Sequence, residues 1–185
     1  MRNLYLIRHG TPDFPDNIKL CIGRTDIDIG VQGVQEAERL GDFFRDFNID
    51  GIYSSPLKRC VHTAEIISGG RIEVRKDENL VEIYMGHWEG IPLKDIRKNL
   101  GDEPVYGERR SHALARVKAA LKRIMENSEG DVICVAHAGV NCAFLASTMG
   151  REIKTSRNIR QPCGCYNRFE FDGKFFRAVE IGCIP

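Results

Sequence analysis

Short runs of apolar residues alternate along this chain with longer segments that have the periodicity of amphipathic helices. Leu4 to Ile7 and Val132 to Ala136 are apolar throughout, as in strands buried on both faces of a sheet. Apolar side chains recur at spacings of three and four over Val31 to Phe47 and from Leu114 to Met125, which predicts two helices. This alternation predicts an α/β protein, a three-layer α/β/α sandwich around a mainly parallel central sheet.

The remaining segments complete this pattern. Ser55 and Pro56 are typical of the cap and first position of a helix, and Asp172-Gly173 is typical of a hairpin turn that would add an antiparallel edge to the sheet. The stretch from Asp77 to Gly107 has no clear periodicity and could build the rim of a pocket. We expect strands at Ile52–Tyr53, Ile72–Val74, Tyr166–Phe171 and Phe175–Ile181, and helices over Leu57–Ile67, Lys94–Asn99 and Val140–Met149.

The composition excludes several functional classes. A length of 185 residues, 42% hydrophobic and 29% charged residues, and a formal net charge of +1 predict one globular domain over residues 1–185. The near-neutral balance gives no sign of nucleic-acid or membrane-surface binding. The polar pair Arg8-His9 comes too early after the first apolar run for a signal peptide or a membrane span. One chain gives no information on oligomeric state.

Seven cysteines are scattered through the chain, mostly in apolar segments. An odd, scattered set favours a reducing compartment over a disulfide framework, so we expect the protein in the cytoplasm. Cys163-Gly164-Cys165 has no partner pair elsewhere, so incidental thiols are a better interpretation than a metal site.

Polar side chains follow three of the predicted strands. Arg8 and His9 follow the first strand, Arg59 lies just beyond Ser54 and Ser55, and His137 follows Val132 to Ala136. Ligands of open α/β sheets bind beyond the carboxyl ends of the strands, so two guanidinium groups and two imidazoles are expected to meet there. Arg59 also lies in the first turn of a helix, where the dipole favours an anion. Arginine matches phosphate oxygens and a neutral imidazole can attack phosphorus, so the pattern predicts a phosphate site.

Four motifs follow one another along the chain. They are Leu6-Ile7-Arg8-His9-Gly10, Ser54-Ser55-Pro56-Leu57-Lys58-Arg59 with Cys60-Val61-His62-Thr63-Ala64, Leu80-Val81-Glu82-Ile83-Tyr84-Met85-Gly86-His87-Trp88-Glu89-Gly90, and Val135-Ala136-His137-Ala138-Gly139. In this order they resemble the signature of the histidine phosphatase superfamily, the phosphoglycerate mutase-like proteins. The segment Gly23-Arg24-Thr25-Asp26 also resembles the family, and the likeness extends over nearly the whole chain. The length and the Gly-x-Trp-Glu-Gly sequence are similar to those of small members such as α-ribazole phosphatases.

The resemblance implies a phosphoglycerate mutase-like fold and a metal-independent phosphatase that uses no cofactor and acts on a small phosphorylated metabolite. Carried over by position, His9 is the nucleophile and becomes phosphorylated, while Glu82 donates a proton to the leaving group. A neutral His9 and a protonated Glu82 suit these roles. Arg8, Arg59 and a protonated His137 would stabilise the phosphoryl oxygens.

Arg24 and Thr25 are further candidates for substrate binding. His62 and His112 are interpreted as structural and surface residues.

Two departures from the family pattern bear on the activity. The chain continues after Gly10 with Thr11-Pro12-Asp13, which changes the contacts expected for the non-phosphate part of a substrate. Only 54 residues separate Glu82 from His137, whereas family mutases carry a longer insertion there that covers the site. An open site lets water reach phosphohistidine, so hydrolysis is favoured over mutase chemistry.

Three alternatives stay open at this point. The first is a cofactor-dependent phosphoglycerate mutase, and the second is a non-catalytic module that binds phosphate or a phosphoprotein. The third is metal-assisted hydrolysis with His9, His137 and Glu82 as ligands, which ranks last because two neighbouring arginines repel a cation. The sequence does not identify the physiological phosphomonoester, which depends on the segments between Gly86 and Arg110 and between Thr155 and Cys165.

Overall fold

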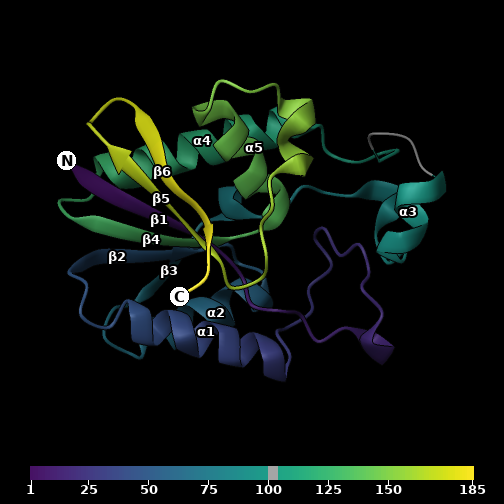
Figure 1. Ribbon diagram of the computed structural model, residues 1–185, viewed down its shortest axis with the longest axis horizontal. Helices are drawn as coiled ribbons and strands as arrows, with labels where there is room; N and C mark the ends of the chain where they lie inside the picture. Colours follow the sequence, from purple (N-terminus) through teal and green to yellow (C-terminus); the bar gives the residue numbers. More distant parts are fainter. Residues whose placement is uncertain (100–103) are drawn as a thin grey trace.

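The computed structural model describes residues 1–99 and 104–185 and contains a six-stranded mixed sheet (Figure 1). Four neighbouring strands are parallel to one another, and β5 is antiparallel to both of its neighbours. The mainly parallel sheet with an antiparallel edge is therefore confirmed. The strands are β1 (Arg2–Arg8), β2 (Ile49–Ser54), β3 (Val74–Lys76), β4 (Asp131–Ala136), β5 (Tyr166–Phe171) and β6 (Phe176–Cys183), in the order β3-β2-β4-β1-β5-β6.

Helices cover both faces of this sheet (Figure 1). The two faces of β1 show why: Leu4 and Leu6 pack in the core beneath α4 and α5, while Tyr5 and Ile7 pack in the core beneath α1 and α2. Alternate side chains of a strand point to opposite faces, so a continuous apolar run requires a layer on each side. The α-helices are α1 (Val31–Phe43), α2 (Lys58–Ser68), α3 (Leu93–Asn99), α4 (Arg110–Glu126) and α5 (Ala138–Thr148), and the 3₁₀ helices are η1 (Pro15–Asn17), η2 (Glu78–Leu80), η3 (Gly86–Trp88) and η4 (Ile153–Asn158).

Several boundaries differ from those expected. Helix α1 ends at Phe43 rather than Phe47, yet the ring of Phe47 still packs edge-on against Tyr5, which explains its place in the apolar pattern. The expected cap of α2 is wrong: Leu57 is the N-cap residue and Ser55 lies two residues before it. Strand β3 begins at Val74, two residues later than the start of the expected strand.

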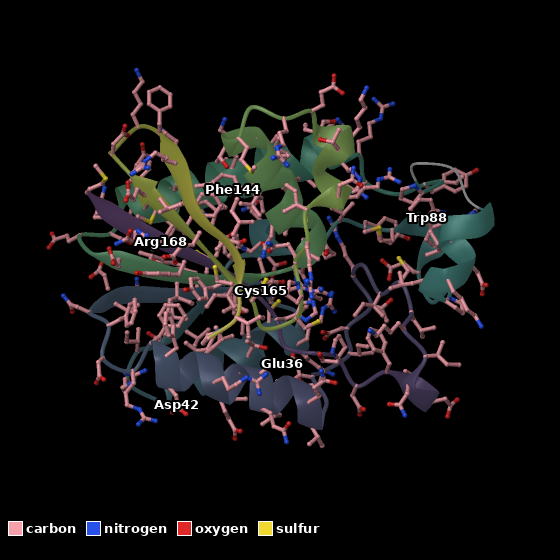
Figure 2. All side chains as sticks on the ribbon, viewed as in Figure 1. Glu36, Asp42, Trp88, Phe144, Cys165 and Arg168 are labelled. Carbon is pink, nitrogen blue, oxygen red and sulfur yellow. The ribbon has the colours of Figure 1, made fainter. Side chains whose placement is uncertain are left out.

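The loop between β1 and α1 pairs with the segment that leads into α3. Cys21 N donates to the Ile91 carbonyl at 2.8 Å, and Leu93 N donates to the Lys19 carbonyl at 2.9 Å. Figure 1 shows both segments together at the side of the molecule where β1 ends, and Figure 2 shows Trp88 on the same side, beside α3. The expected pocket rim from 77 to 107 contributes to this side, and its residues 100–103 lie outside the described residues.

None of the helices in the described parts of the chain is long and apolar enough to cross a membrane.

Candidate active site

His9 follows β1 directly, and its side chain is only 4% exposed. Its Nδ1 lies 2.7 Å from the Gly10 carbonyl oxygen. A carbonyl can only accept, so Nδ1 carries the hydrogen. Burial, together with the charges of Arg8 and Arg59, holds the pKa of His9 well below its ordinary value of 6.5. The ring is therefore neutral near pH 7, and Nε2 keeps an unshared electron pair.

The backbone around His9 is fixed by close packing. Gly164 N donates to the His9 carbonyl at 3.2 Å, and Gly10 N donates to Oγ1 of Thr63 on α2 at 3.0 Å. A Cβ atom on Gly10 would lie 2.4 Å from the carbonyl oxygen of Gly33 in α1, so only glycine permits this approach. The contacts with α1 and α2 therefore hold the turn after β1 in one position.

Two arginines reach the same place from different elements. Arg59 is the second residue of α2, is 1% exposed, and donates from Nη1 to the Thr25 carbonyl at 2.8 Å and from Nη2 to the Gly23 carbonyl at 2.7 Å. Arg8 donates from Nη1 to the Gln161 carbonyl. The Nε groups of both arginines are buried and have no partner among the described residues. These two N–H groups are donors available to an anion.

Glu82 lies between η2 and η3 and is 8% exposed. Its Oε1 accepts from Ile83 N at 2.8 Å, and its Oε2 accepts from Gly139 N, in the first turn of α5, at 2.9 Å. A Cβ atom on Gly139 would lie 2.5 Å from Oε1 of Glu82. The glycine therefore lets the carboxyl group sit against the amino-terminal end of α5, where the helix dipole favours an acidic group.

His137 is fully buried at the start of α5, with its ring centroid 5.2 Å from that of His9. Its Nε2 lies 2.8 Å from Oγ of Ser55. Burial, followed by the charge of Arg59, holds the pKa of His137 well below 6.5. The protonated His137 expected from the sequence is thus not the form that its surroundings favour without a bound anion.

A cavity of about 220 Å³ brings four of the expected residues together. His137 is not among the lining residues and lies behind His9. Arg24 and Thr25 do not line the cavity either: the Arg24 guanidinium is paired with Glu108 at 3.1 Å, and the Thr25 carbonyl holds Arg59. The lining consists of Arg8, His9, Pro12, Phe14, Leu20, Cys21, Ile22, Gly23, Arg59, Glu82, Met85, Leu93, Ala138 and Gly139.

Two supporting residues were not recognised from the sequence. Asp26 accepts from Lys58 N at 2.7 Å through Oδ1 and so caps α2 from outside the helix. Ser55, expected to be that cap, instead holds His137. Nothing in the sequence marks a capping residue 32 positions away from its helix, because capping signals are local.

The cysteine pair at 163 and 165 supports the site through its backbone. Arg8 N donates to the Cys165 carbonyl at 2.9 Å, and Figure 2 shows Cys165 near the centre of the molecule. Both thiols are free. Within residues 1–99 and 104–185, no three His, Cys, Asp or Glu side chains gather as a metal site would need.

The chain belongs to the histidine phosphatase superfamily (branch 1), whose model matches residues 4–184. It is similar to an uncharacterised phosphatase, PhoE, of Bacillus subtilis (strain 168), with 30% identity over 97% of this chain and 94% of the relative. Among solved structures it is similar to YhfR of Bacillus stearothermophilus, with a TM-score of 0.90 and 28% identity over 100% and 98% of the two chains. The α-ribazole phosphatase of Shigella flexneri has the same fold, with a TM-score of 0.83 and 23% identity over 98% and 96%.

Phosphoglycerate mutases match a smaller part of the chain. The 2,3-bisphosphoglycerate-dependent enzyme of Afipia carboxidovorans is 36% identical over 62% of this chain, and the match covers 58% of that enzyme. The phosphatase relatives match over nearly the full length of both chains, so the phosphatase assignment is favoured over the mutase assignment.

Proposed function

We propose that this protein is a phosphomonoester hydrolase in which Nε2 of His9 attacks phosphorus and forms a phosphohistidine intermediate. The observation that carries the proposal is the tautomer of His9. The Gly10 carbonyl holds the hydrogen on Nδ1, so the electron pair is on Nε2 of a neutral ring. That ring lines a small cavity together with two arginines and Glu82.

Arg8 and Arg59 stabilise the phosphoryl group in this proposal. Phosphoryl transfer passes through a loose transition state whose charge is spread over the equatorial oxygens. Two guanidinium groups, each with a buried and unpartnered Nε–H, are fixed by carbonyls before substrate binds, so little reorganisation is needed. His137 adds a third donor when the charge of a bound phosphate favours its protonated form.

Glu82 supplies the proton to the leaving alkoxide. A phosphate dianion beside its carboxyl group favours protonation, because protonation removes the repulsion between like charges. After the alcohol departs, the resulting carboxylate accepts a proton from water as that water attacks phosphohistidine. The cycle returns both residues to their starting state and releases inorganic phosphate.

We further propose that hydrolysis needs no metal and no cofactor, because the positive charges of Arg8 and Arg59 stabilise the transition state and repel a cation. The substrate is a small phosphorylated metabolite whose phosphate binds in the cavity of about 220 Å³. Seven free thiols favour a reducing compartment, the cytoplasm. Residues 1–185 act as a single histidine phosphatase domain.

The test is hydrolysis of 4-nitrophenyl phosphate by the wild type and His9→Ala with excess chelator. We expect activity in the wild type and a loss of more than ~10³-fold in the variant, as for other catalytic nucleophiles. The matched control is His112→Ala, an exposed histidine of α4, which should keep wild-type activity. Alkaline quenching during turnover should trap a phosphorylated protein in the wild type only.

Other outcomes would change the proposal. Turnover that disappears under chelation and returns with a divalent metal would favour metal-assisted hydrolysis. Phosphate binding without turnover would favour a binding module, and isomerisation of 3-phosphoglycerate faster than phosphate release would favour a mutase.

A further inference from the structure

The cavity at His9 is lined by one set of polar side chains and one set of apolar side chains. Arg8, His9, Arg59 and Glu82 form the polar part. Pro12, which follows the turn after β1, is part of the apolar lining. When these four residues bind a phosphate, the rest of the substrate therefore contacts the apolar side chains of the lining. The apolar side chains of the lining are those of Pro12, Phe14, Leu20, Ile22, Met85 and Leu93.

A second, larger cavity of about 520 Å³ adjoins the first. The Leu93 side chain is 39% exposed and belongs to the lining of both cavities. The apolar lining continues outward with Ile18 and Pro92. A molecule that extends from the phosphate position past Leu93 would thus stay in contact with apolar surface until it enters the second cavity.

Two lysines, Lys19 and Lys94, complete the lining of the second cavity, and no acidic residue is part of that lining. Neither ammonium group forms an ion pair with a residue that the structure describes. The backbone bond from Leu93 N to the Lys19 carbonyl, 2.9 Å long, holds the two segments that carry them together. The outer cavity therefore presents two exposed ammonium groups that form no ion pair within the described parts of the chain, on two segments joined through their backbones.

We propose that the substrate carries a second anionic group, separated from its phosphate by an apolar or aromatic body, and that Lys19 and Lys94 bind this group. The proposal rests on the proposed phosphatase function and specifies its substrate class. A carboxylate and a second phosphate have the anionic chemistry that lysine binds, so both are tested below.

The experiment compares aryl phosphates that differ only in charge at the far end. The first substrate is 4-(2-carboxyethyl)phenyl phosphate, the second is its phosphonoethyl analogue, and the third is the neutral 2-carbamoylethyl analogue. The short alkyl spacer keeps the phenol leaving group nearly constant. Two exposed ion pairs should raise kcat/KM for an anionic substrate about fivefold over the amide, mainly through KM, at low salt.

Lys19→Met and Lys94→Met should each reduce this ratio, and the double variant should bring it close to one. Lys174→Met, in the turn between β5 and β6, is the control and should leave the ratio unchanged. A ratio near one in the wild type, or a ratio that both lysine variants leave intact, would overturn the proposal. Failure to hydrolyse any of the three compounds would instead count against the phosphatase function itself.

Discussion

The Gly10 carbonyl decides which nitrogen of His9 is available for chemistry. A carbonyl oxygen has no hydrogen to donate, so the bond to Nδ1 fixes one tautomer. The partners of the His137 ring are Oγ of Ser55 and Sγ of Cys60, and both groups can donate or accept. The two buried imidazoles thus differ: the hydrogen of His9 is fixed on Nδ1, whereas the hydroxyl beside Nε2 of His137 fixes no tautomer. This difference fits the two roles proposed for them.

The proton-donor role proposed for Glu82 predicts that the rate of hydrolysis depends on the leaving group. Glu82→Gln cannot donate a proton, so hydrolysis of an alkyl phosphate, whose alkoxide leaves poorly, should fall by about 10²–10⁴-fold. Hydrolysis of 4-nitrophenyl phosphate should fall much less, because nitrophenolate leaves without a proton. Steady-state rates for both substrates check this.

The unfolding free energy of Glu82→Gln must be measured together with its rates of hydrolysis. The amide replaces one acceptor oxygen that Gly139 N or Ile83 N now uses, which should cost about 1–3 kcal/mol of unfolding free energy. Urea unfolding gives this value. Equal losses for the two substrates in a folded variant would assign Glu82 a positioning role instead.

At the scale of elements, the sequence predicts that His9 and His137 lie close together, but it does not predict the contacts between distant segments that hold the site in place. Strands β1 and β4 are parallel neighbours with Arg8 opposite Ala136, so the residues that follow, His9 and His137, lie together. Apolar runs that end in polar residues show this from the sequence. The capping of α2 by Asp26 depends on contacts between distant segments, which local patterns do not contain.

Asp26 links the loop after β1 to the orientation of α2. Asp26→Ala removes the acceptor for Lys58 N and should lower the unfolding free energy by about 1 kcal/mol, as for other capping residues. Because Arg59 is the next residue and depends on the Gly23 and Thr25 carbonyls, kcat/KM should also fall. Urea unfolding and phosphatase assays check both effects.

The control for Asp26→Ala is Asp42→Ala on the exposed side of α1, labelled in Figure 2. Asp42 pairs only with Arg45 at the surface, so its loss should change neither quantity measurably. Similar losses in both variants would show that Asp26 has no special part in placing Arg59.

At the scale of the whole molecule, the layered core and the outer cavity differ in how the sequence encodes them. The alternation of apolar runs and helical periods specifies the sandwich, because each run must be buried on both faces. The outer cavity arises where the segment around Lys19 pairs with the segment around Leu93, more than seventy residues apart. Neither segment has a periodicity that predicts this pairing. The sequence therefore predicted only that an irregular segment would form the rim of a pocket.

The same core makes stability depend on pH. Burial and the neighbouring arginines hold the pKa values of both His9 and His137 well below 6.5 in the folded protein. In the unfolded chain both titrate near 6.5, so below that pH the unfolded state binds more protons and the unfolding free energy falls. The loss begins near pH 6.5 and continues until the folded-state pKa values are reached. Between about pH 7.5 and 5.5 the contribution of each histidine to the loss has an upper limit of about 1.4 kcal/mol.

Urea unfolding at these two pH values measures the combined loss, whose upper limit is about 2.7 kcal/mol for both histidines. In His9→Gln and in His137→Gln one titrating group is gone, so the loss should be about half as large. His112→Gln changes an exposed histidine and should keep the full loss. A wild-type stability that is equal at the two pH values would mean that the buried imidazoles accept protons without unfolding, and that His9 is not held neutral by its surroundings.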